Sequence, residues 1–195
     1  MPSEPDALRN GRGFGCAYKN VGFSFGFPER CDAKIVLHGS EDDEFPISAE
    51  LFHGGAEVGQ GAHTAFLQMT AEATDLPLDA VRGDFSDTAT SGDSGSASAS
   101  RLTWMAGNSI IGAQEAEKSW RDGDRPAVGE FRFVPPPTEM LDPETGAGQP
   151  NFTYGYVAQA VEVTVDTETG HVRVGRGASP HDLGRPTNEA RAEGQ

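Results

Sequence analysis

The residues best suited to bind a ligand are Gly59, Gln60 and Gly61, which lie between an expected strand and an expected helix. Glycines at such a turn let a ligand approach the backbone, and the first N–H groups of the helix then point at an anion, aided by the helix dipole. This geometry suits a phosphate or pyrophosphate without any lysine. A tight strand-to-helix turn without a ligand is the alternative interpretation.

A second candidate is the small-residue loop 94–100 (SGSASAS), which precedes another expected helix. It offers unhindered backbone N–H groups and several hydroxyl groups that donate or accept hydrogen bonds. A flexible Ser/Gly loop that caps a helix is the alternative here. Two helix starts of this kind in one domain favour a single phosphorylated ligand between them.

The histidines, cysteines and Glu57 do not predict a metal site or a catalytic centre. His53 and His63 flank the glycine turn, but neither they nor Cys16 and Cys31 show the spacing of a structural zinc site. Glu57 could act as a base, while a carboxylate stabilised by the field of the helix N-terminus is the commoner explanation. No nucleophile follows from the spacing, so we expect no catalytic and no metal-ligating residue in this chain.

The strands that would position these loops follow from the apolar pattern. Glycine alternates with aromatic residues over 13–27, which indicates an extended segment packed closely against other backbone. Residues 33–38 (AKIVLH) and 47–52 (ISAELF) predict two strands, and the acidic turn 39–46 joins them into a hairpin.

A strand–helix–strand unit is expected next. Residues 62–74 have helical composition, Pro77 ends that helix, and residues 80–85 predict a further strand. The apolar residues of the helix recur at helical spacing and predict one buried face: Ala65, Phe66, Met69 and Ala73.

A second helix is expected over 99–120, after the polar loop 87–98, which is either ordered or flexible. Its predicted buried stripe consists of Leu102, Met105, Ala106, Ser109, Ile110 and Ala113.

The last third of the chain is expected to be loop and hairpin. Residues 121–152 are rich in Pro, Gly and acidic residues, with a short strand at 131–134. Alternation over 154–166 and the segment 171–174, joined by a turn, predicts the clearest hairpin in the sequence. The expected fold class is α+β, with mixed sheets and hairpins and two main helices.

The chain carries a net charge of −15, and only three of its 15 basic residues are lysines. Such a surface repels phosphate backbones, so we expect no nucleic-acid partner. An acidic surface almost without lysine is typical of adaptation to high salt, in a halophilic host, although an ordinary acidic protein is the alternative.

The first residues, MPSEPDALRN, show neither the basic region nor the apolar stretch of a secretory signal. No run approaches the ~20 apolar residues of a membrane span. We therefore expect a cytoplasmic protein in which Cys16 and Cys31 are reduced.

Taken together, the blocks resemble the large, molybdopterin-binding subunit of the xanthine dehydrogenase and aldehyde oxidase family. They occur in the family's order and span nearly the whole chain: GRGFGCAYKNVGFSFGFPE (11–29), HGGAEVGQGAHTAFLQMTAE (53–72), DTATSGDSGSASASRLTWMAGNSI (87–110), FTYGYVAQAVEVTVDTETGHVRV (152–174) and HDLGRPTN (181–188).

The resemblance implies a cofactor-binding fold and its site residues. The chain would form part of the molybdopterin-binding domain of a molybdenum hydroxylase. Gly59, Gln60 and Gly61 match the family's GQG, whose backbone and glutamine contact the pterin. The Ala/Ser loop that lines the other side of the cofactor is matched by Ala97, Ser98, Ala99 and Ser100. The cofactor would be molybdopterin with molybdenum, in its cytosine dinucleotide form.

The resemblance also implies companion chains. In the family, the catalytic glutamate lies downstream of the matched blocks, whereas this sequence stops at Gly194-Gln195. The chain is therefore expected to be a fragment or split subunit that helps hydroxylate a small N-heterocycle or aldehyde. Its partners would supply the remaining large-subunit portions, the [2Fe-2S] clusters and FAD. A truncated, non-catalytic cofactor-binding or vestigial module is the alternative.

The expected organisation has four parts. Residues 1–12 form a loose N-terminal segment and 13–120 the cofactor-binding α+β portion. A Pro/Gly-rich loop follows over 121–152, and 153–195 contain the hairpin and a C-terminal segment that is truncated relative to the family.

Overall fold

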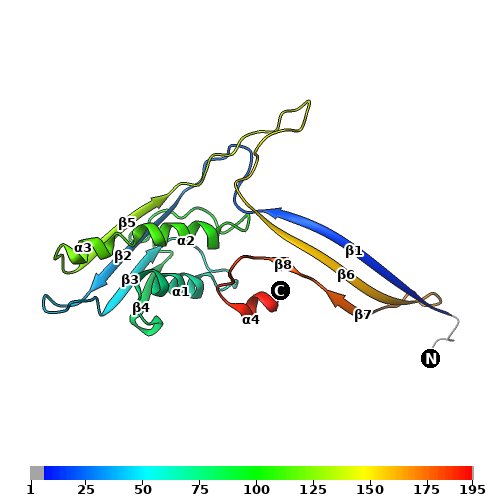
Figure 1. Ribbon diagram of the computed structural model, residues 1–195, viewed down its shortest axis with the longest axis horizontal. Coiled ribbons are helices and arrows are strands. Elements are labelled where there is room, and N and C mark those ends of the chain that lie inside the picture. Colours follow the sequence, from blue (N-terminus) through cyan, green and yellow to red (C-terminus); the bar gives the residue numbers. More distant parts are fainter. Residues whose placement is uncertain (1–6, 195) are drawn as a thin grey trace. The chain divides into compact units, whose positions relative to one another are not determined.

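The computed structural model describes residues 7–194, apart from the side chain of Arg191. The chain divides into two compact units (Figure 1). The first unit combines the described part of Met1–Lys19 with Tyr154–Arg185, and the second combines Asn20–Thr153 with the described part of Pro186–Gln195.

The second unit is built on a four-stranded sheet in the order β4-β3-β2-β5. The central strands β2 (Cys31–His38) and β3 (Ser48–His53) form the predicted antiparallel hairpin. On the other side of β2, β5 (Ala127–Phe133) pairs with it antiparallel. β4 (Val81–Phe85) pairs parallel with β3, as the predicted strand–helix–strand unit requires.

Helices cover one face of this sheet (Figure 1). α1 (Ala62–Thr74) connects β3 to β4 and has the predicted bounds. α2 (Leu102–Ala113) packs against β2, β5 and α1, and α3 (Ala116–Arg121) packs against β5. The short helices η2 (Leu78–Ala80) and α4 (Glu189–Glu193) complete the unit.

The core lies between this sheet and its helices. Along β2 every second residue is buried, because successive side chains of a strand point to opposite faces. All six residues of the stripe predicted on α2 are buried, which confirms that prediction. The face predicted on α1 is rotated, since Ala62, Phe66, Thr70 and Thr74 are its buried residues. The two threonine hydroxyls are satisfied by the helix's own carbonyls, at Phe66 and Thr70.

The predicted second helix, 99–120, begins later and is interrupted. Ala99 and Ser100 have left-handed φ values of 53° and 54°, which a helix cannot include, so α2 begins at Leu102. α2 and α3 are separate helices at the point where the backbone of β5 approaches them. A Cβ on Gly129 would lie 2.1 Å from the carbonyl oxygen of Ala113 and 2.4 Å from the nitrogen of Ala116.

The first unit is a sheet of long strands in which β1 (Leu8–Asn20) pairs with β6 (Tyr154–Asp166). The predicted hairpin is confirmed, since β6 pairs antiparallel with β7 (Val172–Ala178), and the short β8 (His181–Asp182) also pairs with β6. Residues 8–12, expected to be loose, belong to β1 because β6 supplies their partner. The rest of that expected segment, 1–6, lies outside the described residues.

The segment 121–152 contains more strand than predicted, because β5 begins at Ala127. Arg121 is the last residue of α3, and the rest of the segment is loop and turn. Within residues 7–194, no helix has the length and apolar character needed to cross a membrane.

Candidate functional site

The turn before α1 is held by the carboxylate of Glu57. Its Oε1 accepts hydrogen bonds from the backbone N–H groups of Gly59 at 2.7 Å and Gly61 at 2.9 Å, and its Oε2 accepts from His63 N at 3.2 Å. Gly59 and Gly61 have φ values of 103° and 81°, which L side chains rarely adopt, so glycine is required at both positions. These hydrogen bonds, led by the one from Gly61, lower the pKa of Glu57.

This arrangement corrects one part of the sequence interpretation. The amide cluster at the start of α1 was expected to point at the phosphate of a ligand, but it already binds an anion from the chain itself. The interpretation of Glu57 as a carboxylate at the helix N-terminus describes the structure, because its two oxygens accept three backbone hydrogen bonds.

The side chain of Gln60 is also fixed within this turn. Its Oε1 accepts from Val58 N at 2.7 Å, and its Nε2 donates to the carbonyl oxygen of Ala56 at 2.9 Å. An amide oxygen accepts two hydrogen bonds and an amide nitrogen donates two. One acceptor position and one donor position of this exposed amide therefore remain for a ligand.

The second candidate loop is held by a buried cation. The Nη1 of Arg101 donates to the carbonyl oxygens of Ser94 at 2.7 Å and Ser96 at 3.1 Å, and its Nε lies 3.1 Å from Oε2 of Glu29. The side chains of Arg101 and Glu29 are each 1% exposed. The other oxygen of Glu29 accepts a short hydrogen bond from Phe23 N. This ion pair therefore connects two segments that are distant in the sequence, 23–29 and 94–101.

The two candidate loops face one cavity of about 330 Å³. Gln60 and its neighbour Val58 line one side of it. The other side is the segment from Ala97 to Thr103, without Ala99. Of the predicted site residues, the cavity therefore brings together Gln60, Ala97, Ser98 and Ser100.

The other three predicted residues are not among the lining residues. Gly59 and Gly61 shape the turn that presents Gln60. Ala99, in its left-handed conformation, directs its carbonyl oxygen to Gly22 N at 2.9 Å. At the cavity, the first amides of α2, at Leu102 and Thr103, lack an acceptor within their own helix. Both residues line the cavity, so we expect their amides to be the backbone donors nearest to a ligand.

A buried pair of polar side chains lies where β3 ends, at His53, and β2 begins, at Cys31. His53 Nδ1 accepts from Gly55 N at 3.0 Å, and its Nε2 lies 3.4 Å from Sγ of Cys31. Burial, followed by the charges of His63 and Arg101, lowers the pKa of His53 to about 4. Burial also raises the pKa of the Cys31 thiol. At neutral pH these two side chains are therefore an uncharged imidazole and a thiol, a structural pair without a nucleophilic thiolate.

The sequence interpretation missed Arg101 and Ser94. Ser94 lay inside the candidate loop, but its buried hydroxyl was not distinguished from its exposed neighbours. Arg101 directly follows the loop, in a chain with few basic residues. An arginine between a small-residue loop and an apolar helix is the signal that could have identified it, because a cation there needs buried partners.

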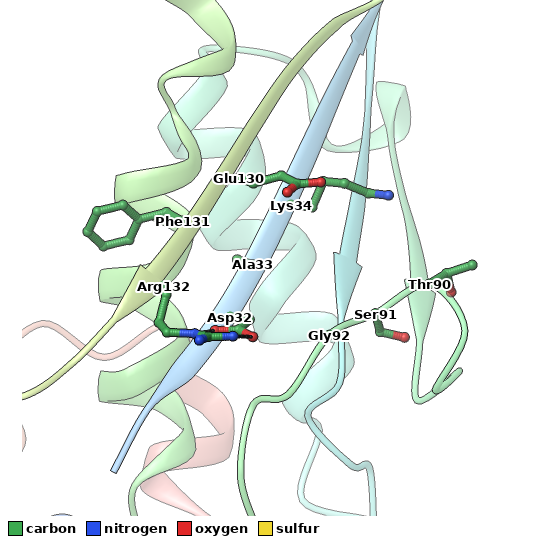
Figure 2. A pocket seen from close by; sticks show the side chains of 9 residues that line it. All are labelled: Asp32, Ala33, Lys34, Thr90, Ser91, Gly92, Glu130, Phe131 and Arg132. Carbon is green, nitrogen blue, oxygen red and sulfur yellow. Dashed lines mark hydrogen bonds and ion pairs between the residues drawn. The ribbon is translucent and has the colours of Figure 1, made fainter. Parts of the chain in front are cut away.

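A second cavity, of about 370 Å³, lies on the face of the sheet opposite the helices (Figure 2). Its charged groups neutralise one another, since Arg132 binds both oxygens of Asp32, at 2.7 and 2.9 Å. Phe131 points to the other side of β5, where it packs against Gly112 of α2. None of the predicted site residues lines this cavity. Among residues 7–194, no three His, Cys, Asp or Glu side chains are grouped as metal ligands.

Comparisons with known proteins agree with the fold. The family model described as the molybdopterin cofactor-binding domain matches residues 2–121 and 116–195. The xanthine dehydrogenase/oxidase of Felis catus is 26% identical over 203 residues, covering 94% of this chain and 15% of that protein. The aldehyde oxidoreductase of Megalodesulfovibrio gigas is 28% identical over 183 residues, covering 84% of this chain and 18% of that protein.

A solved structure has the same fold. The crystal structure of the aldehyde oxidoreductase from Desulfovibrio desulfuricans superposes with a TM-score of 0.81 at 24% identity, covering 96% of this chain and 22% of that one. The α+β architecture is therefore that of part of a molybdenum-binding domain. The chain spans less than a fifth of the length of the two curated relatives.

Proposed function

The chain belongs to the molybdopterin cofactor-binding domain family, and from this premise we propose that it forms part of the cofactor site of a molybdenum hydroxylase. The observation that carries the proposal is the cavity of about 330 Å³ between Gln60 and the segment 97–103. Residues from two separate loops, both selected by the sequence pattern, line it together.

The donor set of this cavity fits a phosphorylated pterin. Gln60 offers an amide that both donates and accepts, which suits the mixed hydrogen-bonding edges of a pterin ring. Ser98 and Ser100 offer hydroxyl groups, and the first amides of α2 offer neutral donors within the positive field of a helix start. Glu57 accepts hydrogen bonds from three backbone amides at the start of α1. The phosphate would therefore lie on the side of α2.

When bound, the group would supply the molybdenum centre at which a substrate carbon is hydroxylated. Our assignment gives the residues of this chain a binding and orienting role. Gln60 would hold the pterin edge, Ser98 and Ser100 would contact the opposite side, and Arg101 would keep the second loop in place. Ala97 would let the ligand approach the backbone of the loop, since its side chain is small. Gly59 and Gly61 would shape the turn that presents Gln60, and Ala99 would fix the loop through Gly22.

We propose that catalysis needs further polypeptide. The catalytic glutamate, the [2Fe-2S] clusters and FAD would come from companion domains or subunits, and the substrate would be a small N-heterocycle or aldehyde. Two of the relatives, a xanthine dehydrogenase/oxidase and an aldehyde oxidoreductase, support this range of substrates. The cytosine dinucleotide is the form of the cofactor that we propose.

The test is to co-express the full chain with its companion subunits and to measure molybdenum and cytosine nucleotide in the purified complex. We expect both to be retained. Replacing Gln60 by alanine should reduce molybdenum retention, because the pterin contact and the fixed turn are both lost. The matched control is Gln68→Ala on α1, which removes the same amide away from the cavity.

Three outcomes decide the proposal. A complex without molybdenum would overturn it. Equal molybdenum content in Gln60→Ala and the native complex would remove Gln60 from the site. Molybdenum retained without turnover of any N-heterocycle or aldehyde would instead establish the non-catalytic cofactor-binding module.

A further inference from the structure

The cavity has two walls, the turn 54–61 with Gln60 and the segment 97–103. One buried residue, Ser94, connects them. Its Oγ accepts a hydrogen bond from Gly54 N at 3.1 Å and donates one to the carbonyl oxygen of Asp32 at 3.2 Å. Its own carbonyl oxygen accepts from Nη1 of Arg101 at 2.7 Å. Gly54 begins the turn that presents Gln60, and Arg101 precedes α2. Ser94 therefore contacts both walls, and it is only 2% exposed.

Arg101 extends this connection to the rest of the unit. Besides Ser94 and Ser96, its guanidinium donates to the carbonyl oxygen of Arg30 at 2.8 Å and pairs with Glu29. A planar guanidinium with five donors can serve these separate acceptors at once, whereas the compact ammonium of lysine cannot. Buried ion pairs add little net stability on average, so specifying one arrangement is the better-supported role for this pair.

The loop is folded closely around the guanidinium. Gly95 has a φ of +68°, and a Cβ at that position would lie between 2.8 and 3.1 Å from three atoms of the Arg101 guanidinium group. The loop therefore needs both a left-handed residue and one without a side chain at this position. Ala97, Ser98 and Ser100 lie between Gly95 and Arg101 in the sequence. The contact between Gly95 and the Arg101 guanidinium therefore restrains where these three residues can lie.

We propose that Ser94 and Arg101 are positioning residues that fix the separation of the two cavity walls, so that the turn with Gln60 and the loop 97–100 hold one ligand together. Their effect on a bound cofactor rests on the proposed function. The coupling between the two walls does not, since it is a property of the protein alone. The two parts can therefore be tested separately.

The coupling is tested by hydrogen–deuterium exchange on the full chain without any ligand. Ser94→Ala removes the acceptor of Gly54 N–H, and we expect exchange in the segment 54–61 to rise by about tenfold, since one buried hydrogen bond is lost. Arg101→Lys should raise exchange in 94–101 and, through Ser94, in 54–61 as well. The matched control is Arg12→Lys, which changes an exposed ion pair with Glu162 in the first unit.

Unchanged exchange over 54–61 in both Ser94→Ala and Arg101→Lys would overturn the coupling. An equal rise in Arg12→Lys would also overturn it, because the effect would then be general loosening. Ser94→Thr keeps the hydroxyl group and should restore protection. If Arg101→Lys does not fold, the Ser94→Ala and Ser94→Thr pair decides the matter.

The effect on the ligand is tested in the co-expressed complex by molybdenum content at matched thermal stability. We expect Arg101→Lys to lose at least several-fold more molybdenum than Arg12→Lys, and Ser94→Thr to retain more than Ser94→Ala. Equal losses at equal stability would show a merely structural role and overturn the positioning of the ligand. A native complex without molybdenum would overturn the proposed function, while the exchange result would stand.

Discussion

The Oε1 atom of Glu57 lies 2.9 Å from the backbone nitrogen of Gly61, at the start of α1. The amide cluster that the sequence offers to a ligand anion is thus occupied by an anion of the chain. A phosphate could bind there only by displacing this carboxylate, and the two negative charges would repel each other.

Inorganic phosphate should therefore leave the Gly61 amide resonance of the native chain unchanged in an NMR titration. In Glu57→Ala the amides of Gly59 and Gly61 become free, and phosphate should shift both resonances. Glu144→Ala removes the same charge elsewhere and should behave like the native chain. A phosphate-dependent shift of Gly61 in the native chain would contradict the assignment.

His53 should make the folding stability depend on pH. Because its pKa is lowered to about 4, protons bind preferentially to the unfolded chain, where the pKa is about 6.5. Its contribution to stability is fully present above about pH 6.5 and is lost progressively as the pH falls towards 4. The loss should reach about 3 kcal/mol, since one pKa unit corresponds to about 1.4 kcal/mol.

Urea unfolding at several pH values measures this dependence. His53→Gln cannot titrate and should flatten the profile between pH 4 and 6.5, relative to the native chain. His38→Gln, which changes a half-exposed histidine near Glu50, is the matched control for the substitution itself. A His53→Gln profile as steep as the native one would show that other groups cause the dependence.

Gly95→Ala should destabilise the loop for two reasons that a second variant separates. The φ of +68° strains any L residue, and the added Cβ collides with the Arg101 guanidinium. Gly146 has a φ of +69° and open space around its Cβ position, so Gly146→Ala carries the strain alone, about 1 kcal/mol. We expect Gly95→Ala to lower the free energy of unfolding by about 1–3 kcal/mol more, the range for overpacking. Equal losses of unfolding free energy in Gly95→Ala and Gly146→Ala would exclude a collision between the added Cβ and Arg101.

Gly129→Ala should be more damaging still. Its Cβ would lie within 2.4 Å of two backbone atoms, at Ala113 and Ala116, and backbone cannot move aside as a side chain can. We expect a loss of about 3 kcal/mol or more in unfolding free energy. Gly177→Ala, also in a strand but with open space, should change the stability by less than about 1 kcal/mol. Thermal denaturation of the two variants gives the comparison.

The parts of the fold that depend on local pattern were predictable. The spacing of apolar residues identified α1 with its bounds and every buried position of α2, because helical periodicity reports which side faces the core. The interruption after Ala113 was not predictable, because it reflects the close approach of Gly129 from a strand that comes later in the sequence.

The candidate site was predictable in its location and less so in its contacts. Small residues at two helix starts indicated both loops, and Gln60, Ala97, Ser98 and Ser100 do line one cavity. The ion pair of Arg101 with Glu29 joins residues 72 positions apart, and no local pattern reports such a contact. Glu57 was recognised as a helix-start carboxylate, but its hydrogen bonds to both turn glycines depend on their left-handed conformation.

The pairing of β1 with β6 has a consequence for the order of events during synthesis. Residues 20–153 are continuous and carry their own sheet and helices. β1 precedes them in the chain, and its hydrogen-bonding partner is synthesised more than 130 residues after it. The pairing of β1 with β6 therefore closes a long loop of chain, which makes it a slow step compared with the formation of local contacts.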